Sequence, residues 1–363
     1  MLYFKNDTFK IMQIADTQEG RRVSPDTIDL INAALDREEP DLVVYSGDQI
    51  WGKSSFKGNR QEVKRVLDEL TAPVRNRNIP FTVCFGNHDR QVGLSNEEQF
   101  EIYSEMNCFV GKDTDGIDGT ANHTIEIRDG DELKFLLYLI DSHSSLSIGY
   151  DCVHQNQIDW YRQTRDEYEQ KYGHLIPSIV IQHIPLCEVF ELLTEVKRST
   201  KGAVRGFRTH ANRFYVLNRD RVNKDGFMKE SPADPQENSG EFAAFKEKGE
   251  VLGVYFGHDH NNSFNGKVDG IDLGYTQGAG FHVYGPGKDR GVRIIELQKD
   301  GGFDTYDLRF KNLVGNKVKE PFRYALFQIM PTNMFDALTR AIKFFVGLGV
   351  LALAVILLLF FFG

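Results

Sequence analysis

Cysteine is scarce in this chain, and its few cysteines stand far apart. The 363 residues contain four of them, and no two form a Cys-x-x-Cys pair: Cys84, Cys108, Cys152 and Cys187. Zinc knuckles and disulfide-rich small folds need closely spaced cysteines, so neither is indicated. A reducing compartment is the simpler interpretation, although an even number of cysteines leaves disulfides open.

An excess of basic residues is also missing, and secretion by a cleaved signal is not expected. The formal net charge is −9, whereas proteins that hold nucleic acid by their overall potential usually have a basic excess. No nucleic-acid binding is therefore expected. The first residues, MLYFKNDTFK, run directly into a strand-like segment, without the apolar stretch and small-residue cleavage site of a secretion signal.

The C-terminal end carries a long hydrophobic run. Residues 344–362 read FFVGLGVLALAVILLLFFF without a charge, and about 20 such residues span a bilayer as a helix. We predict a single-pass transmembrane anchor over 344–362, with a buried core helix as the alternative. Arg340 and Lys343 precede the run and only Gly363 follows it, so the positive-inside tendency places the large N-terminal part on the cytoplasmic side of the membrane.

Five apolar runs end in polar residues that can bind metals. They are Phe9 to Ala15 before Asp16, Asp41 to Ser46 before Gly47-Asp48, Pro80 to Phe85 before Gly86-Asn87-His88-Asp89, Ser178 to Gln182 before His183, and Val251 to Phe256 before Gly257-His258-Asp259-His260. In open α/β sheets, ligand sites gather at the carboxyl ends of the strands. One site built from distant parts of the chain is therefore predicted.

Helix-like stretches separate these strands, which favours a layered α/β core. The expected helices are Pro25 to Arg37, Gln61 to Leu70, Asn96 to Met106 and Asn156 to Lys171. The later segments Ile271 to Tyr275, Gly291 to Leu297 and Phe303 to Phe310 read as antiparallel strands joined by Gly-rich turns. They are expected to complete a second sheet.

Composition divides the chain into three parts. We predict a catalytic domain over 1–312, a linker and juxtamembrane segment over 313–343, and the anchor over 344–362. Within the domain, 195–240 is predicted to be a basic loop or cap, because ten Lys or Arg stand against two Asp between Lys197 and Lys229. Such a segment is either a solvated surface or a contact for an anionic substrate or an anionic lipid surface.

The residues at the strand ends suit the hydrolysis of a phosphate ester. This reaction needs a deprotonated water, neutralised phosphoryl oxygens and a proton for the leaving group, and two cations about 3.5–4 Å apart can supply the first two. The candidate ligands are Asp16, Asp48, Asn87, His183, His258 and His260. In the GNHD motif, His88 is free to act as an acid, with Asp89 as its predicted orienting partner.

The ordered motifs resemble those of the calcineurin-like metallophosphoesterases, and within them the purple acid phosphatase-like proteins. The motifs are DTQ at 16–18, GDQIWG at 47–52, GNHD at 86–89, QHIPL at 182–186, NSG at 238–240, GHDH at 257–260 and GAGFHVYG at 278–285. The resemblance covers roughly residues 8 to 310. It implies a four-layer αββα sandwich, with two mixed sheets flanked by helices, and a hydrolase that acts on phosphate mono- or diesters.

The resemblance also implies a role for each matched residue. Asp48 would bridge two divalent or mixed-valence metal ions, with Asp16 and His260 on the first and with Asn87, His183 and His258 on the second. His88 would contact the phosphate and protonate the leaving oxygen, while a metal-bound hydroxide attacks in line. The metals are Mn, Fe or Zn, and the sequence does not choose among them.

Two positions depart from the family pattern. Gln18 stands where most of the family has a histidine, so the first metal would be held through an uncharged amide or held weakly. Trp51 stands where true purple acid phosphatases have a tyrosine that ligates iron, so neither the purple colour nor a ferric ion is expected. We therefore weigh a membrane-tethered phosphoesterase against a membrane-tethered pseudoenzyme that binds a phosphorylated ligand without cleaving it.

The remaining candidates lie outside these motifs. His282 and Tyr284 are candidates for lining the substrate entrance, with packing of their loop against the sheet as the alternative. The other histidines are assigned structural or surface roles: His123, His143, His154, His174 and His210. His143 follows Asp141 at another strand end, which places it near the predicted site.

Overall fold

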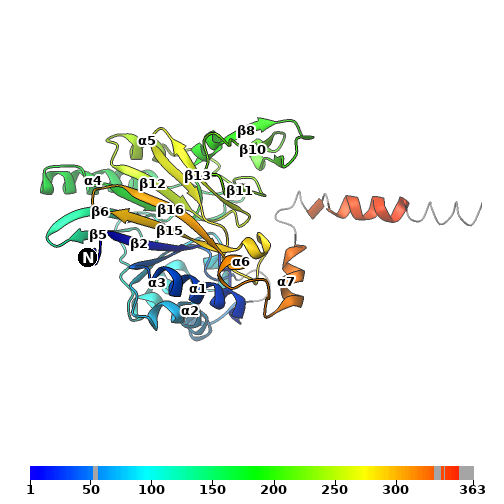
Figure 1. Cartoon of the computed structure of the whole chain (residues 1–363), viewed down its shortest axis with the longest axis horizontal. Helices are drawn as coiled ribbons and strands as arrows, with labels where there is room; N and C mark the ends of the chain where they lie inside the picture. Colours follow the sequence, from blue (N-terminus) through cyan, green and yellow to red (C-terminus); the bar gives the residue numbers. More distant parts are fainter. Residues whose placement is uncertain (52–55, 331–336, 339, 351–363) are drawn as a thin grey trace, which may run out of the picture.

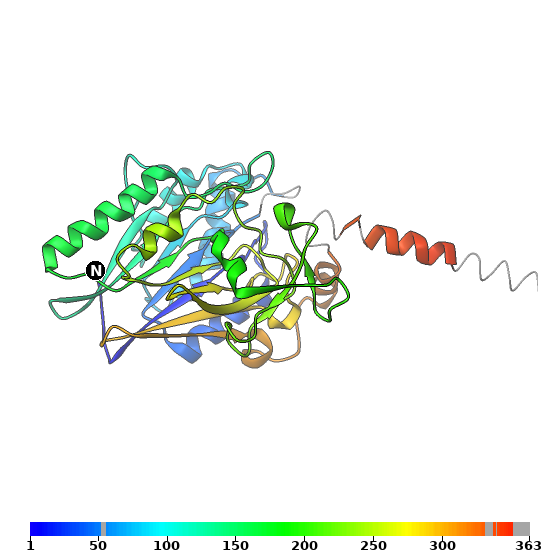
Figure 2. The same ribbon diagram turned by 90° about the horizontal axis from the view of Figure 1, so that it is seen from above.

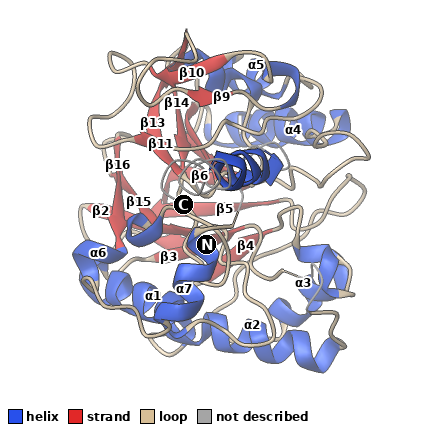
Figure 3. Cartoon of the chain, turned by 90° about the vertical axis from the view of Figure 1, so that its right-hand side faces the viewer, coloured by secondary structure: helices blue, strands red, loops and turns tan. Residues whose placement is uncertain are grey.

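A computed structural model of the chain describes residues 1–51, 56–330, 337–338 and 340–350 (Figure 1). Two sheets face each other at the centre of the fold, and helices lie on their outer sides (Figure 3). The mixed α/β fold that the sequence predicts is confirmed. All four cysteines are free thiols.

The first sheet has five strands in the order β16-β15-β2-β3-β4. β2, β3 and β4 run parallel, whereas β15 pairs antiparallel with both β2 and β16. The strands are β2 (Thr8–Ile14), β3 (Leu42–Ser46), β4 (Phe81–Cys84), β15 (Gly291–Gln298) and β16 (Phe303–Arg309). The parallel strands therefore deliver the first three predicted motifs to one edge of this sheet.

The second sheet has eight strands in the order β1-β5-β6-β7-β12-β14-β13-β11. Its centre, β6 to β14, is parallel. The strands are β1 (Leu2–Tyr3), β5 (His123–Asp129), β6 (Glu132–Leu139), β7 (Ser178–Ile181), β11 (Phe227–Met228), β12 (Val251–Phe256), β13 (Asn262–Val268) and β14 (Ile271–Tyr275). The later motifs follow β7 and β12 in this central, buried part.

Three apolar clusters fill the spaces between the layers. One, including Ile11 and Ile179, lies between the two sheets. A second packs the five-stranded sheet against α1 (Pro25–Glu38), α2 (Arg60–Arg75) and α3 (Asn96–Ser104). The third packs the eight-stranded sheet against α4 (Gln155–Tyr172) and α5 (Glu241–Lys246). The layers therefore run helices, sheet, sheet, helices.

Local sequence signals fix where the first helices begin. The Ser24 side chain caps α1 by accepting the Asp26 N–H, and Pro25 occupies the first helical turn. Asn59 and Glu62 form a capping box that starts α2. The expected helix at Gln61 to Leu70 is therefore longer than predicted, because the cap lies further upstream and the helix continues past Pro73.

The segment predicted as a basic loop or cap contains short structure of its own. β8 (Leu193–Val196), β9 (Val204–Arg205) and β10 (Phe214–Leu217) form a small sheet in the order β8-β10-β9. Figures 1 and 2 show it in green at the edge of the molecule. The described residues also contain four short 3₁₀ helices: η1 (Asp89–Val92), η2 (Cys187–Leu192), η3 (Arg208–His210) and η4 (Gly287–Asp289).

After β16 come α6 (Phe310–Leu313) and α7 (Pro321–Gln328). The predicted transmembrane helix over 344–362 is corrected here: across the residues that the structure describes, every helix is too short or too polar to cross a bilayer. Hydrophobicity alone supported that prediction. Residues 351–362 of the run lie outside the described residues. The cytoplasmic placement, which depends on the same run, stays a prediction.

Candidate metal centre

The strand ends of both sheets meet at one buried place. Asp16 follows β2 and Asp48 follows β3 in the first sheet, whereas His183 follows β7 and His258 follows β12 in the second. The backbone N–H of His258 donates to Asp16 Oδ2 at 2.9 Å, and this bond joins the two sheets across 242 positions of sequence. Both carboxylates and both imidazoles are at least nine-tenths buried.

Asp48 lies at the centre of this group. Its Oδ1 accepts the backbone N–H of His88 at 2.7 Å. Its Oδ2 lies 3.4 Å from His183 Nε2 and accepts the amide of Gln18 at 2.9 Å. Burial would raise the pKa of Asp48, but the positive charges of His183 and His88 lower it well below the usual range. Asp48 is therefore held as a carboxylate.

The imidazoles are oriented by backbone carbonyls. His183 Nδ1 lies 2.9 Å from the carbonyl of Ser46, and His260 Nδ1 lies 3.0 Å from that of Tyr284. Each carbonyl accepts the Nδ1–H and leaves Nε2 facing the carboxylates, which is how histidine ligands are commonly set. Accordingly, His260 Nε2 lies 3.3 Å from Asp16 Oδ1. Burial would lower the pKa of His183, but Asp48 and Asp16 raise it to about 10.

The donor set fits a pair of metal ions. Ligand atoms of Asp16, Asp48 and His260 all lie within 4.8 Å of one another. Four buried polar atoms at this place have no hydrogen-bond partner among the described residues: Asp16 Oδ1, Asn87 Oδ1, His88 Nδ1 and His258 Nε2. Buried polar atoms are nearly always satisfied, and carboxylate, amide and imidazole are the ligand types that Mn, Fe and Zn accept.

Two glycines permit the loops to approach this closely. A Cβ on Gly86 would lie 2.2 Å from Asp48 Oδ1, and a Cβ on Gly47 would lie 2.4 Å from the His183 ring. Any larger residue would therefore displace a candidate ligand. Several non-glycine residues also hold positive φ, namely Asp16 (53°), Gln18 (41°), Asp48 (54°) and His258 (71°). Such strain is typical of functional sites.

Asp89 takes a different part from the one predicted. Its two oxygens accept four backbone N–H groups, from Asp48 at 2.8 Å, Gln49 at 2.8 Å, Ile50 at 3.2 Å and Gly86 at 2.8 Å. With its oxygens so occupied, the carboxylate ties the β3 and β4 loops together and does not orient the His88 ring. The reason is the turn into η1, which points Asp89 into the protein. Burial and then Asp48 raise the pKa of Asp89 to about 7.

Gln18 and Trp51 stand beside the centre. Gln18 directs its amide nitrogen at Asp48 Oδ2, so its carbonyl oxygen is not the atom that faces the carboxylate. The nitrogen and oxygen of an amide are placed by the hydrogen-bond network. Trp51 lies edge-on to the His88 ring, with centroids 6.2 Å apart. The residue in the tyrosine position therefore borders the predicted acid.

The two entrance candidates, His282 and Tyr284, lie in different surroundings. The ring of Tyr284 stacks on His260 at 4.2 Å, directly beside the centre. His282 instead is buried between Glu19, 3.1 Å from its Nδ1, and Glu320, 2.7 Å from its Nε2. Its place at the entrance stays a prediction, and the carboxylates of Glu19, in the loop after β2, and of Glu320, just before α7, hold the ring.

Sequence reasoning missed Tyr150. Its ring packs edge-on against His258 at 4.4 Å, and the guanidinium carbon of Arg208 lies 5.9 Å from the Tyr150 ring centre. A cation of the basic segment is thus brought toward the centre. The excess of Lys and Arg between Lys197 and Lys229 indicated an anionic contact, but nothing in the sequence singled out one arginine or Tyr150.

Known proteins are similar to this chain in sequence. The relative named "Probable inactive purple acid phosphatase 14", from Arabidopsis thaliana, is 29% identical over 339 residues, which cover 82% of this chain and 77% of that one. "Phosphatase DCR2" from Saccharomyces cerevisiae is 28% identical over 324 residues, which cover 80% of this chain and 51% of that one.

The fold has a solved counterpart. A dimetal phosphatase from Danio rerio superposes with a TM-score of 0.50 at 14% identity, and the match covers 83% of this chain and 99% of that one. At this identity the likeness concerns the fold alone. The family model described as calcineurin-like phosphoesterase matches residues 9–262, a range that contains every candidate ligand from Asp16 to His260. The chain belongs to the calcineurin-like phosphoesterase family.

Proposed function

We propose that this chain hydrolyses a phosphate mono- or diester at a centre of two metal ions. The observation that carries the proposal is the convergence of buried ligand atoms that have no hydrogen-bond partner among the described residues, on Asp16, Asn87 and His258. Family membership supports it, because the family is one of metal-dependent phosphoesterases. When bound, the two cations would supply an ionised water at neutral pH and neutralise the phosphoryl oxygens.

The ligands divide into two groups around Asp48. Asp16 and His260 approach each other on one side, with His260 Nε2 3.3 Å from Asp16 Oδ1. His183 and His258 lie on the other side, with His183 Nε2 and His258 Nδ1 3.3 Å apart. We assign the first pair to one ion, and the second pair together with Asn87 to the other. Asp48 lies 3.4 Å from His183 Nε2 and within 4.8 Å of the ligand atoms of Asp16 and His260, so it would bridge.

His88 is assigned as the proton donor to the leaving oxygen. Its backbone N–H is held by Asp48, its ring lies against Trp51, and its Nδ1 has no partner among the described residues. A ring fixed at its base and free at one nitrogen can deliver a proton to a group bound at the centre. Arg208, which lies over Tyr150, offers a positive charge to an anionic substrate.

The test compares two variants of the full chain loaded with Mn²⁺ or Zn²⁺. His88→Ala should lower turnover of p-nitrophenyl phosphate or of bis(p-nitrophenyl) phosphate by about 10²–10⁴-fold, as expected for the loss of a general acid. His174→Ala is the matched control, because His174 is exposed beyond the end of α4. The proposal fails if metal-loaded wild type cleaves neither ester.

A second function is favoured by Gln18. Its uncharged amide stands where most of the family has a histidine, and it donates to Asp48, so Gln18 is a weaker candidate ligand for one metal position. Relatives from Arabidopsis thaliana carry the word inactive in their names. In this alternative the chain binds a phosphorylated ligand without cleaving it. Elemental analysis separates the two functions, since two metals per chain favour the enzyme and one or none favours the binding protein.

A further inference from the structure

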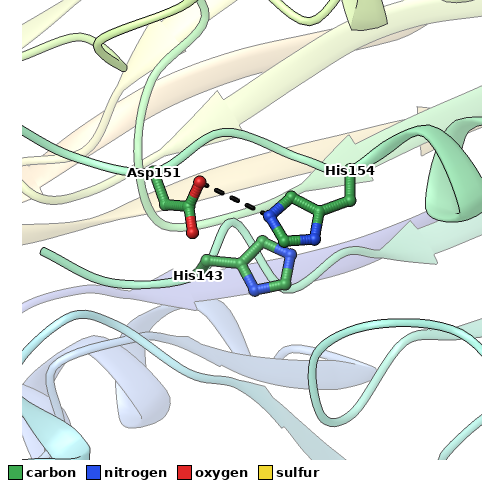
Figure 4. A group of neighbouring side chains, drawn as sticks. All are labelled: His143, Asp151 and His154. Atoms are coloured by element: carbon green, nitrogen blue, oxygen red, sulfur yellow. Dashed lines mark ion pairs between the residues drawn. The ribbon is translucent and has the colours of Figure 1, made fainter. Parts of the chain in front are cut away.

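A second group of metal-competent side chains lies apart from the ligands described above. It consists of His143, Asp151 and His154 (Figure 4), whose candidate ligand atoms all lie within 4.8 Å of one another. His143 follows β6, Asp151 closes a short hairpin, and His154 immediately precedes α4. None of the three has a part in the proposed hydrolysis.

The proton on His143 is fixed by Gln157. His143 Nε2 lies 2.7 Å from Gln157 Oε1, which also accepts the backbone N–H of His154 at 2.8 Å. The amide nitrogen of Gln157 donates to Asn122 Oδ1 at 2.9 Å and to the carbonyl of Asp141 at 2.8 Å. These four bonds orient the amide, so its oxygen must accept from Nε2–H. The Nδ1 of a neutral His143 is then left with a lone pair.

The proton on His154 is fixed in the same way by Asp118. His154 Nδ1 lies 2.6 Å from Asp118 Oδ2, so this nitrogen donates. His154 Nε2 faces Asp151 Oδ1 at 3.4 Å. In a neutral ring these are two acceptors with no hydrogen between them, and a positive ion would relieve the repulsion. A histidine whose outer nitrogen donates to a carboxylate is the usual arrangement of a metal ligand.

A protonated His154 between two carboxylates is the alternative. Burial lowers the pKa of His154, but the hydrogen bonds to Asp118 and Asp151 raise it more, so the net shift is upward. That ion pair explains the position of the His154 ring but not that of the His143 ring. It gives no reason for His143 to stack on His154, with ring centroids 4.0 Å apart and planes at 21°. The stack brings a ring nitrogen of His143 within 4.8 Å of the candidate ligand atoms of Asp151 and His154.

The backbone around the cluster is held in place before any ion binds. His143 has a φ of 63°, and its N–H donates to Asp141 Oδ1 at 2.8 Å. The N–H of Asp151 donates to the carbonyl of Ser144 at 2.9 Å and closes the hairpin. An uncommon φ held by specific bonds is typical of functional positions. His143 and Asp151 also line a cavity of about 330 Å³, which gives access from solvent.

We propose that His143, Asp151 and His154 bind one divalent transition-metal ion, with zinc as the first candidate. Two imidazoles and one carboxylate form a ligand set that zinc accepts, and the cavity leaves room for water at the remaining positions. The site is separate from the two-metal centre and does not depend on hydrolysis. It adds a third ion to each chain.

The hairpin links this site to the two-metal centre. Ser144, next to His143, donates its hydroxyl to the carbonyl of Asn87 at 3.3 Å. Tyr150, next to Asp151, packs against His258. An ion that holds both ends of the hairpin therefore steadies a segment that touches two candidate ligands of the other centre. Its effect on the main site is to position residues, since the links run through Ser144 and Tyr150.

The first test counts ions in the full chain. Metal-stripped protein is dialysed against a fixed low concentration of Zn²⁺ and analysed for bound zinc. His143→Ala and His154→Ala should each bind one equivalent less than wild type, whereas His174→Ala should match wild type. Circular dichroism confirms that each variant is folded. Equal zinc content in wild type and in both cluster variants overturns the proposal and leaves the ion pair as the explanation.

The second test leaves the cluster intact and removes the histidine ligands of the other centre. In the triple variant His183→Ala, His258→Ala, His260→Ala, shown by circular dichroism to be folded, one equivalent of Cu²⁺ should bind and show coupling to two nitrogens by electron paramagnetic resonance. Adding Asp151→Asn should weaken this binding at least tenfold. A folded triple variant that binds no Cu²⁺, or binds it with the same affinity after Asp151→Asn, contradicts the proposal. Neither result depends on whether the chain hydrolyses an ester.

Discussion

Replacing Asp89 by asparagine tests how the two metal-bearing loops are held together. Asp89 is fully buried and accepts the N–H groups of Asp48 and Gly86 on one oxygen, and those of Gln49 and Ile50 on the other. Asparagine has the same shape but only one acceptor oxygen. Its amide nitrogen must therefore face two backbone N–H groups that have no other acceptor.

The expected loss of stability follows from the two N–H groups that lose their acceptor. Two buried donors left unsatisfied at about 1–3 kcal/mol each give about 2–6 kcal/mol of lost stability. Ordinary domains unfold with about 5–15 kcal/mol, so Asp89→Asn should remain folded but be markedly weaker. Because either orientation of the new amide releases the backbone N–H of Asp48 or that of its neighbour Gln49, metal affinity should fall together with stability. If Asp89 merely oriented His88, its replacement would lower turnover and leave the free energy of unfolding unchanged.

Urea unfolding measures the effect. The full chain is unfolded in the presence of a chelator, with fluorescence from Trp51 and Trp160 as the probe, so that bound metal does not contribute. Asp131→Asn is the matched control, because Asp131 lies exposed in the turn between β5 and β6. A free energy of unfolding for Asp89→Asn within about 0.5 kcal/mol of that of the control, the usual range for surface substitutions, would refute the reasoning.

Three further predictions concern other residues. Gln18→His should raise the zinc content at limiting metal, because an imidazole replaces an amide that donates to Asp48; unchanged content by elemental analysis would count against a ligand at this position. Burial raises the pKa of Glu241 to about 8, so the stability that it contributes below its unfolded pKa is lost as pH rises through 8. Between pH 5 and 9 the free energy of unfolding of Glu241→Gln, measured in urea, should therefore rise relative to that of wild type by at most about 5 kcal/mol. Curves of unfolding free energy against pH that stay parallel for the two proteins would contradict this. His282→Ala should speed amide exchange in α7, since it removes the contact with Glu320, and should leave the KM for a phosphate ester unchanged; a raised KM would place His282 at the entrance.

The positions of the candidate ligands could be predicted because each stands directly after an apolar strand. Parallel strands bring their carboxyl ends to one edge, so Asp16, Asp48 and Asn87 meet without further information. The structure brings His183, His258 and His260 to the same place from the other sheet. Their service as metal ligands stays a prediction.

What could not be predicted depends on partners distant in sequence. Asp89 follows His88 directly, which suggested a pair, yet the 3₁₀ turn at η1 sends its carboxylate into the β3 loop. His282 lies two residues from Tyr284, but its ring meets Glu320, 38 positions away. The prediction from the hydrophobic run at 344–362 failed for another reason, since it rests on composition alone, which does not give the length of the helices that the structure describes.

The left-handed backbone at the centre has a consequence for how this protein can change. Asp16, Gln18, Asp48 and His258 each hold a conformation that glycine adopts without strain and that other residues hold at about 1–3 kcal/mol. Replacement by glycine would release that strain, but at Asp16 and Asp48 it would also remove the acceptor of the backbone N–H of His258 or of His88. The strained conformation is therefore kept by the same side chains that are the candidate ligands, so a more stable loop cannot be obtained here without losing a ligand.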